Sequence, residues 1–556
     1  MACLTSKRLF ESFSGFRRLW TPPLLLVLAI FAYPARGVSQ AETKSETGSE
    51  STGKSATVFR FHMPTEPHTL DPSLVTSSDA AYLTHNLQRG LFSYSQKTGL
   101  KPEGARECRF ETPVKLVCDL DTSVQWSDGS PVVAEDYVRA FRRLASPKAK
   151  NPGVDLLMSV KNAVAAHGGR EPVEKIGVSA PSPSQLVIEL DTADPEFLFK
   201  LSSSVLVPVK LPKGMTEFPK RQESHKLLFS GPYKLESWTP GKRARLAPNP
   251  LYKKGNPKRP PVEVIFVDDD QTALALYEQG ELTFLRRLPT HLIAAYKQNP
   301  GFRQIPVARF DYVGFAGALR ESRDLRAALA LSADYRELKK LYDALGLPGC
   351  PGIPEDSLDR PRCHTFDLKK AREHLARVPE SLRKKRLKLG FSKLGGDDVK
   401  KGMEWLQHQW KKNLGVRVDL EQMEQAVYIA TLKREPPDVF RKGVGLDRPT
   451  CLAALETFAK GGSENFLKID DARFEAHVKA LREATAPDLN SRQAETAVSS
   501  AARKACGEGL QRLMDEFFLI PLGRIHFTLL ARPDFSGWTL NEMNQLDLSD
   551  LTTKIR

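Results

Sequence analysis

Residues 126–147 read WSDGSPVVAEDYVRAFRRLASP, and this stretch decides the fold. Its Ser-Asp-Gly segment has the composition of a tight turn. From Ala134 onward, acidic residues come first and basic residues last, which suits the helix dipole, and Pro147 closes the helix. One helical face carries the apolar residues Tyr137, Val138, Phe141, Leu144 and Ala145. The stretch therefore predicts a turn followed by an amphipathic helix.

Strands and helices alternate along the rest of the chain. Residues 262–267 and 416–420 have the composition of strands, and residues 108–126 predict two short strands around a polar turn. Residues 80–92 have helical spacing, as does the apolar stripe formed by Val399, Met403, Leu406 and Trp410. Such alternation favours mixed α/β lobes. The large aromatic residues that we expect in the core are Trp126, Phe141, Trp238 and Trp410.

A series of short motifs runs in order between residues 58 and 535. They lie at residues 70–72, 86–92, 230–238, 249–252, 277–282, 324–336, 410–418 and 515–521. Together with residues 126–147, this series strongly resembles the extracellular solute-binding proteins of peptide and oligopeptide ABC importers. The resemblance implies a periplasmic-binding-protein-like α/β fold with two main mixed α/β lobes, an extra inserted lobe and a hinge. It also implies a monomer that delivers a small peptide or similar solute to ABC permease subunits in the membrane.

The spacing of the matches predicts how the chain divides. Residues 1–41, before the first match, are expected to be a signal peptide, and residues 42–55 a flexible linker. The inserted second lobe is expected at 93–205 and the third lobe at 309–515. The first lobe is expected to be discontinuous, and its predicted segments are 56–92, 206–308 and 516–556.

In the family, an extended ligand is enclosed between the first and third lobes. Main-chain hydrogen bonds to such a ligand give affinity without reading its side chains. Lobe closure then follows from the ligand's preference for the closed state. The resemblance places ligand contacts on two segments and one flanking strand: Thr76, Ser77, Ser78, Tyr312, Arg441, Lys442, Gly443, Val444, Gly445 and Asp447.

Asp447 is the sharpest of these predictions, because the family commonly places an aspartate just after this strand to pair with the ligand's free α-amine. Counted forward from Gly443, Asp447 occupies that position, but counted back from Pro449 it lies two residues too close. Val444 replaces the family's tryptophan. The alternative for Asp447 is a helix-start cap. Arg441 can pair with a ligand carboxylate or serve as an internal ion-pair partner, and we favour the internal pair.

The N-terminal residues predict export to the periplasm. A basic region precedes the apolar run LLLVLAIF at 24–31, and Ser39 and Ala41 suit a cleavage site before Glu42. No cysteine lies directly after the apolar run, so a lipid-anchor motif is not expected. Residues 48–55 (GSESTGKS) fit the phosphate-loop pattern, but polar residues precede them instead of a strand, and a strand follows instead of a helix. We interpret them as linker.

Composition narrows the remaining function classes. The chain has 556 residues, 41% of them hydrophobic and 27% charged, enough for a sizeable core. Its net charge is +15, but the densest basic cluster, residues 383–386, lacks the aromatic and glycine pattern of a nucleic-acid-binding module, so no nucleic-acid partner is expected. Catalytic signatures and metal-ligand spacings are missing as well. The chain is therefore expected to be no enzyme and to have no cofactor or metal.

Seven cysteines are present, and six remain after the signal peptide. An even number in an oxidising compartment favours disulfides over a zinc site. Six cysteines allow 15 pairings. We predict that neighbours pair: Cys108 with Cys118, Cys350 with Cys363, and Cys451 with Cys506.

Several alternatives stay open on the sequence alone. A protein of the same fold can bind nickel, haem or an oligosaccharide, or can serve as a ligand sensor. A secreted hydrolase is a further alternative, which would need a nucleophile and a base that the sequence does not reveal. Ligand identity and length do not follow from the residues.

Overall fold

The structure is a computed structural model of the whole chain, which divides into two units, Met1–Ser55 and Ala56–Arg556. The residues that it describes all belong to the second unit. They are residues 58–75, 80–97, 99–149, 152–215, 217–341, 349–351, 362–394, 396–462, 464–485, 499–523 and 526–554.

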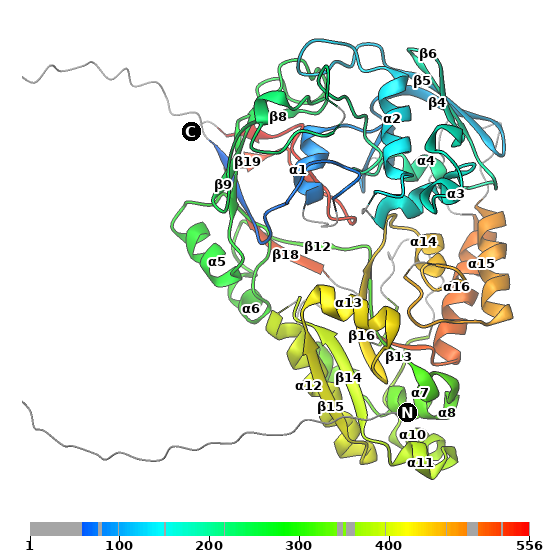
Figure 1. The fold of residues 1–556 in the computed structure, drawn as a ribbon. Coiled ribbons are helices and arrows are strands. Elements are labelled where there is room, and N and C mark those ends of the chain that lie inside the picture. Colours follow the sequence, from blue (N-terminus) through cyan, green and yellow to red (C-terminus); the bar gives the residue numbers. More distant parts are fainter. Residues whose placement is uncertain are drawn as a thin grey trace, which may run out of the picture. The chain divides into compact units, whose positions relative to one another are not determined.

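The first lobe is built on a seven-stranded sheet with the strand order β12-β18-β11-β1-β10-β9-β8 (Figure 1). Its strands are β1 (Phe59–Met63), β8 (Tyr233–Thr239), β9 (Arg243–Pro248), β10 (Val262–Phe266), β11 (Phe284–Leu285), β12 (Phe302–Pro306) and β18 (His526–Ala531). β1 pairs with β10 in parallel, so two segments about 200 residues apart in the sequence lie side by side in one sheet and share one core. Other elements of this lobe are α1 (Ala80–Leu87), η3 (Ser224–Lys226), α5 (Asp270–Glu278), η4 (Thr290–Leu292), α6 (Ile293–Tyr296), β19 (Phe535–Ser536), β20 (Thr539–Leu540), β21 (Leu546–Asp547) and β22 (Thr552–Thr553).

The inserted lobe has a four-stranded antiparallel sheet with the order β4-β5-β7-β6. Its strands are β4 (Ala105–Thr112), β5 (Lys115–Leu120), β6 (Val178–Ser182) and β7 (Gln185–Glu189), and the hairpin of β2 (Phe92–Ser95) and β3 (Gly99–Pro102) leads into it. Its helices are α2 (Ala134–Leu144), η1 (Pro152–Leu157), α3 (Ala163–His167), η2 (Val173–Lys175) and α4 (Phe197–Lys200).

The predicted turn and helix at residues 126–147 form the centre of the inserted lobe. The carboxylate of Asp136 accepts hydrogen bonds from the indole of Trp126, at 2.9 Å, and from the backbone N–H of Val133, at 3.1 Å. The first bond ties the turn to the helix, and the second satisfies a free amide at the helix start. Trp126 and Phe141 are fully buried. The same residues that fit one helical face therefore build the core of this lobe.

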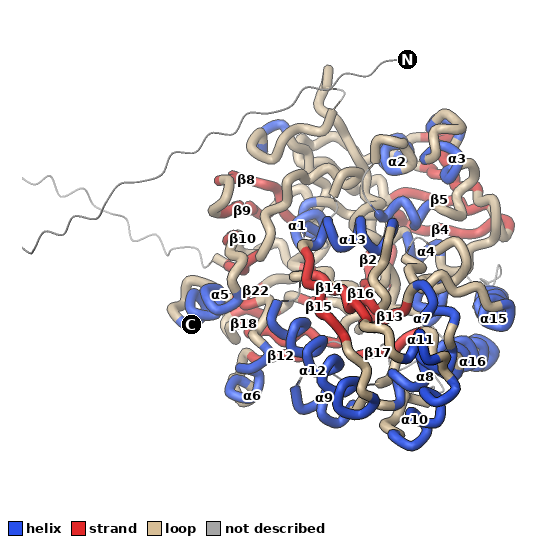
Figure 2. Tube along the Cα trace, turned by 60° about the horizontal axis from the view of Figure 1, so that its bottom comes forward, coloured by secondary structure: helices blue, strands red, loops and turns tan. Residues whose placement is uncertain are grey.

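The third lobe contains a five-stranded sheet with the order β15-β14-β16-β13-β17, and Figure 2 shows it with α13 on one side and α9 and α12 on the other. Its strands are β13 (Arg309–Phe315), β14 (Leu387–Ser392), β15 (Val418–Met423), β16 (Val439–Gly445) and β17 (Leu519–Gly523). Its helices are α7 (Gly317–Glu321), α8 (Arg323–Leu331), α9 (Tyr335–Leu341), α10 (Leu368–Arg377), α11 (Glu380–Arg383), α12 (Gly396–Leu414), α13 (Gln425–Arg434), α14 (Cys451–Glu456), α15 (Ala472–Ala484) and α16 (Ser500–Asp515).

Two boundaries differ from those predicted. The helix expected at 80–92 ends at Leu87, because residues from Phe92 onward pair in the β2–β3 hairpin. Residues 516–523 were assigned to the first lobe, but β17 pairs with β13 in the third-lobe sheet. The boundary at 515/516 is therefore wrong, and the chain returns to the first lobe only between β17 and β18.

Three disulfides join Cys108 to Cys118, Cys350 to Cys363, and Cys451 to Cys506, the pairings expected from the sequence. The first lies across the β4–β5 hairpin, where the two cysteines face each other, and the third links α14 to α16. Over the described ranges, no helix combines the length and the apolar character that a membrane crossing needs.

Candidate ligand-binding site

Three strands of the third-lobe sheet end at one edge, which we call the carboxyl edge. β14 runs parallel to both β15 and β16, so all three present their last residues, Ser392, Met423 and Gly445, on the same side. In open α/β sheets, ligands bind outside the carboxyl ends of the strands. The topology therefore points to this edge as the place for a ligand.

Both connections between the first and third lobes also lie at the carboxyl edge. β13 is antiparallel to β16, with Arg309 opposite Gly445, so β13 starts here directly after first-lobe strand β12. β17 is antiparallel to β13 and ends here before first-lobe strand β18. Connections that pass through one edge leave the two lobes free to pivot about it, which is the arrangement of a hinge.

Side chains alternate between the two faces of β13 and β16. Phe310, Tyr312, Phe440 and Val444 all point into one hydrophobic cluster beneath α14 and α16. Tyr312 is fully buried there, and its ring contacts that of Phe458 edge-on at 5.3 Å between centroids. The predicted cleft-lining role does not fit this position, because the Tyr312 side chain has no surface to offer a ligand. The same holds for the buried side chain of Val444.

The opposite face of these two strands carries a buried ionic cluster. Asp311, 1% exposed, pairs with Arg309 at 2.7 Å and with Arg441. Burial by itself would raise the pKa of Asp311, but the two guanidinium groups outweigh it and hold the pKa below its ordinary value. Arg441 is therefore an internal ion-pair partner, the interpretation that the sequence favoured. Sequence reasoning missed Arg309 and Asp311, although two charged residues in an otherwise apolar strand are a usable signal.

Gly443 lies on the same face of the sheet as this ionic cluster. Because it has no side chain, the Arg309 and Asp311 side chains can lie directly against its backbone. A Cβ atom at position 443 would collide with the Arg309 guanidinium and the Asp311 carboxylate. Gly445, two residues further along the same strand face, has open space around it. The first glycine is therefore required by packing, whereas the second leaves bare backbone at the carboxyl edge.

This difference gives a matched pair of variants. Gly443→Ala is expected to lower the free energy of unfolding by about 1–3 kcal/mol, because the ionic cluster has to shift to admit a methyl group. Gly445→Ala is expected to change it by no more than about 0.5 kcal/mol. Urea denaturation followed by tryptophan fluorescence measures both values. Equal losses in the two variants would contradict the packing role assigned to Gly443.

Lys442 is held inside the third lobe. Its ammonium group lies 2.6 Å from the carboxylate of Glu464 and 5.1 Å from the ring centre of Phe466. The ammonium group of Lys442 is therefore already paired within the third lobe.

Asp447 follows β16 at the carboxyl edge, and its side chain is 42% exposed. Its nearest described cation is Arg448, whose Nη1 lies 3.6 Å from the carboxylate. The helix-start cap that was the alternative for Asp447 is supplied by Thr450, whose hydroxyl accepts a hydrogen bond from the Ala453 N–H at 3.2 Å. Asp447 is therefore not the cap of α14.

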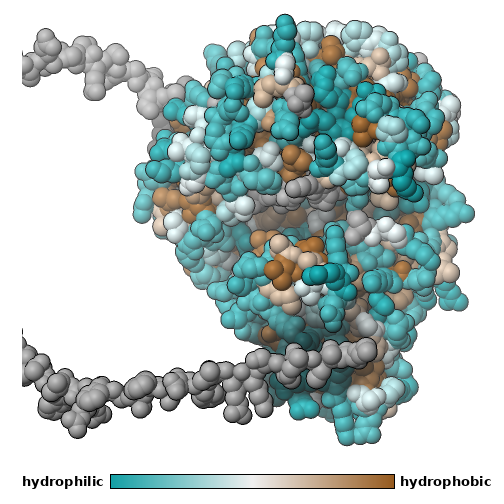
Figure 3. Space-filling view, viewed as in Figure 1, coloured by the Kyte–Doolittle hydropathy of each residue, from teal (hydrophilic) through white to brown (hydrophobic). Residues whose placement is uncertain are grey.

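Apolar surface also lies at the carboxyl edge. Leu394, just beyond β14, is 65% exposed, and Val427, in the first turn of α13, is 57% exposed. Figure 3 shows apolar surface around α13. Both side chains lie at the edge that the strand topology assigns to a ligand. The periodicity of the sequence did not predict that Leu394 and Val427 are exposed, because exposure at a strand end depends on the neighbouring lobe.

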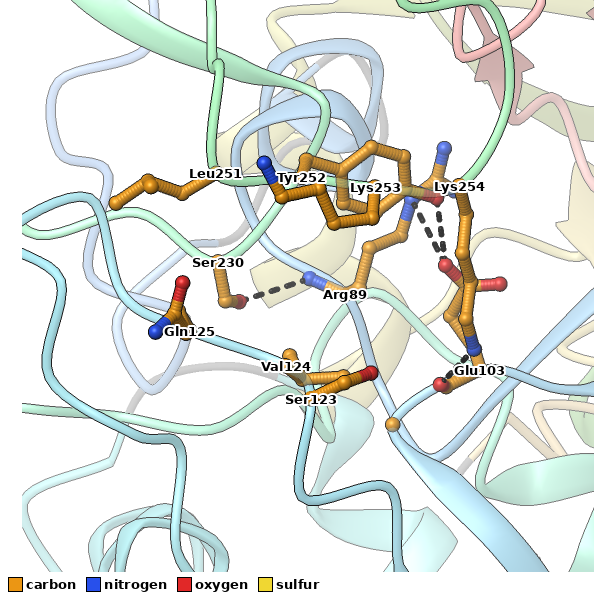
Figure 4. Close-up of a pocket in the computed structure, with 11 residues that line it drawn as sticks. Arg89, Glu103, Ser123, Val124, Gln125, Ser230, Leu251, Tyr252, Lys253 and Lys254 are labelled. Carbon is orange, nitrogen blue, oxygen red and sulfur yellow. Dashed lines mark hydrogen bonds and ion pairs between the residues drawn. The ribbon is translucent and has the colours of Figure 1, made fainter.

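A separate small pocket lies where first-lobe and inserted-lobe residues meet, and Figure 4 shows the side chains that line it. Tyr252 donates a hydrogen bond to Glu103 at 2.6 Å, and the Arg89 backbone N–H donates one to Ser230 at 3.3 Å. The cavity measures about 20 Å³, enough for roughly one water molecule. It is too small for a peptide.

Thr76, Ser77 and Ser78 lie outside the described residues, so their predicted ligand contacts stay predictions. Within the part of the chain that the structure describes, no group of three or more His, Cys, Asp or Glu side chains is arranged to hold a metal ion.

The model of the family described as "Bacterial extracellular solute-binding proteins, family 5 Middle" matches residues 114–466, more than half of the chain. The chain belongs to this family. The match covers most of the inserted lobe, the second first-lobe segment and the third lobe through α14. Members of this family are binding proteins, and the fold predicted from the sequence motifs is confirmed.

Known proteins of this solute-binding family resemble the chain over most of its length. The oligopeptide-binding protein OppA of Bacillus subtilis is 24% identical over 476 residues, covering 81% of this chain and 86% of its own. The probable deoxycholate-binding periplasmic protein YgiS of Escherichia coli is 25% identical over 466 residues, covering 80% and 86%. Among solved structures, Burkholderia pseudomallei OppA superposes with a TM-score of 0.74 at 20% identity, covering 90% of this chain and 100% of that one.

Proposed function

We propose that this solute-binding protein captures peptides, or a similarly extended solute, at the carboxyl edge of its third lobe and delivers them to an ABC permease. The observation that carries the proposal is the carboxyl edge itself. It combines the end of β16, bare backbone at Gly445, the exposed carboxylate of Asp447 and both connections to the first lobe. A ligand held there would bridge the two lobes and favour their closure.

The relatives support a peptide as the ligand. Besides B. subtilis OppA, the dipeptide-binding protein of Lactococcus lactis is 24% identical over 462 residues, covering 78% of this chain and 84% of its own. A Listeria monocytogenes OppA structure bound to peptide superposes with a TM-score of 0.73 at 19% identity, covering 90% of this chain and all of that one. In the proposed complex, the backbone of residues 443–445 pairs with the ligand main chain.

The proposed setting is the periplasm. Residues 1–41 would serve as a cleavable signal peptide without a lipid anchor, and the mature protein would act as a monomer with permease subunits as its membrane partners. Reconstitution with the permease would distinguish import, in which labelled peptide enters vesicles, from sensing, in which it does not.

A second ligand class is favoured by one observation. YgiS is named as a probable deoxycholate-binding protein, and this chain matches it over as much of its length as it matches OppA. The exposed Leu394 and Val427 would suit the apolar face of such a steroid acid.

The decisive measurement is calorimetry with the full-length protein and three ligands: a mixture of free short peptides, the same peptides N-acetylated, and deoxycholate. Heat with the free peptides supports the proposal. Heat with deoxycholate alone replaces peptide by the steroid acid, and no heat with any peptide overturns the peptide assignment. Native mass spectrometry of the freshly purified protein would identify any ligand that accompanies it.

Asp447→Ala tests the amine anchor. We expect this variant to weaken binding of peptides with a free amine by about 2–5 kcal/mol, since lobe closure would bury the charge pair. Affinity for N-acetylated peptides should stay unchanged, because they carry no α-amine. Equal losses for both peptide forms would remove Asp447 from the anchor role.

A further inference from the structure

One buried cation joins the inserted lobe to the third lobe. Arg448, between β16 and α14, is 3% exposed, and its Nε lies 2.8 Å from the carboxylate of Glu196, just before α4. The hydroxyl of Thr450 donates a hydrogen bond to the same carboxylate at 3.0 Å. Both partners of Glu196 thus belong to the loop that follows β16.

On its other side, Arg448 faces carboxylates of its own lobe. Its Nη2 lies 2.9 Å from Glu456, and its Nη1 lies 3.6 Å from Asp447. One guanidinium therefore serves three carboxylates drawn from two lobes. Because Asp447 is the proposed ligand anchor, the contact with the inserted lobe lies one residue from the proposed site.

The path of the chain shows that no direct backbone connection joins the two lobes that the Glu196–Arg448 pair links. The chain joins the third lobe to the first lobe twice, between β12 and β13 and between β17 and β18, whereas the inserted lobe leaves and re-enters the first lobe alone. No backbone segment therefore holds Glu196 against Arg448. If the third lobe pivots at its two connections, this buried ion pair has to separate.

We propose that the Glu196–Arg448 pair is an inter-lobe latch, in which Arg448 is a positioning residue that makes the inserted lobe part of the closed site. The inference rests on the proposed closure of the lobes. It goes beyond ligand capture, because it assigns a role to the inserted lobe and to a residue that contacts Asp447.

The charges around Glu196 make the latch sensitive to pH. Burial raises the pKa of Glu196 to about 7, and although Arg448 opposes this rise, Glu456 and Asp194 add to it. Asp194 is itself paired with Lys200 at 2.6 Å, and Glu456 with Arg482 at 2.7 Å, so neither neighbour of Glu196 has to take up the proton. A protonated Glu196 can still accept the hydrogen bond from the Thr450 hydroxyl.

The sign of the effect follows from linkage. In the open state Glu196 meets water and has an ordinary pKa of about 4.3. The latched state therefore binds the proton more tightly than the open state. Acid favours the latch, and that gain is lost as the pH rises through about 7.

Hydrogen exchange of the full-length protein, read by mass spectrometry, tests the latch without any ligand. Each variant is read on the lobe that it does not alter. Arg448→Gln is expected to raise exchange in residues 192–202, and Glu196→Ala to raise it in residues 446–458, each by roughly tenfold, because opening exposes hydrogen bonds on both sides. Arg482→Gln is the matched control, since it removes a cation from Glu456 within the third lobe only.

The pH dependence of the latch is tested with Glu196→Gln, a variant that keeps the shape of the side chain and its hydrogen-bond acceptor but cannot titrate. After correction for intrinsic rates, exchange in residues 446–458 of the unmodified protein is expected to fall roughly tenfold between pH 8 and pH 5.5. Glu196→Gln should show no such change. Unaltered exchange on the opposite lobe in both Arg448→Gln and Glu196→Ala would overturn the latch, whatever the calorimetry says about peptides.

Discussion

Replacing Asp311 by Ala is expected to lower the free energy of unfolding by about 3–5 kcal/mol, because the change removes a buried carboxylate that pairs with the buried Arg441 and the partly buried Arg309. Arg441 is almost fully buried, and Arg309 covers Gly443 on the same strand face. Without the carboxylate, the two guanidinium groups would also repel each other. Urea denaturation at pH 7, followed by circular dichroism, measures the loss.

The matched control is Asp419→Ala in β15 of the same sheet. Asp419 pairs with Arg386 at the surface, where 46% of its side chain is exposed, so its loss should cost no more than about 1 kcal/mol. A similar cost for both aspartates would show that burial does not strengthen the Asp311 cluster.

The Asp311 effect also has a defined pH dependence. The lowered pKa of Asp311 means that its contribution to stability is present above its ordinary pKa of about 4. That contribution is lost as the pH falls through the lowered value. The stability difference between the unmodified protein and Asp311→Asn should therefore be constant from pH 8 to pH 5 and shrink only in stronger acid.

Removing the Cys451–Cys506 disulfide is the second large effect. The double variant Cys451→Ala/Cys506→Ala is expected to lose about 4 kcal/mol of unfolding free energy, because the bond closes a loop with a sequence separation of 55. It also ties α14, which follows the latch residue Arg448, to α16. Thermal and urea denaturation of the oxidised protein measure the loss.

The Cys108–Cys118 pair is the control for loop length. Its separation is 10 residues, so the double alanine variant should lose about 2.5 kcal/mol, roughly 1.5 kcal/mol less than the Cys451–Cys506 variant. An equal or larger loss at the short loop would mean that strain or local packing, and not loop entropy, sets the contribution of these bonds.

Local elements of this protein could be predicted from sequence because their causes are local. The helix expected from residue 134 is α2, since its apolar spacing, dipole-matched charges and terminal proline all lie within the segment. Neighbouring cysteines are likewise paired in the structure. The strand at 262–267 was found for the same reason, as β10.

Contacts between residues far apart in the sequence could not be predicted from the sequence. No residue near 519 indicates that β17 joins β13, more than 200 residues earlier, instead of the first-lobe sheet. The same applies to Glu196 and Arg448, because an isolated Glu and an isolated Arg look like surface residues until the fold buries them together. In the site, sequence located the β16 segment but could not tell which side chains face inward, since an aromatic such as Tyr312 suits either a core or a cleft.

The three disulfides are unevenly distributed among the lobes, so reduction would not lower the stability of every lobe. One lies in the inserted lobe and two lie in the third lobe, while the first lobe, now residues 56–92, 206–308 and 524–556, contains no cysteine at all. A reductant would therefore weaken two lobes and spare the one that carries β1 and β22, the first and last strands among the described residues. Because no disulfide spans a lobe boundary, these bonds would stabilise each lobe separately and place no covalent restraint on the pivot between the first and third lobes.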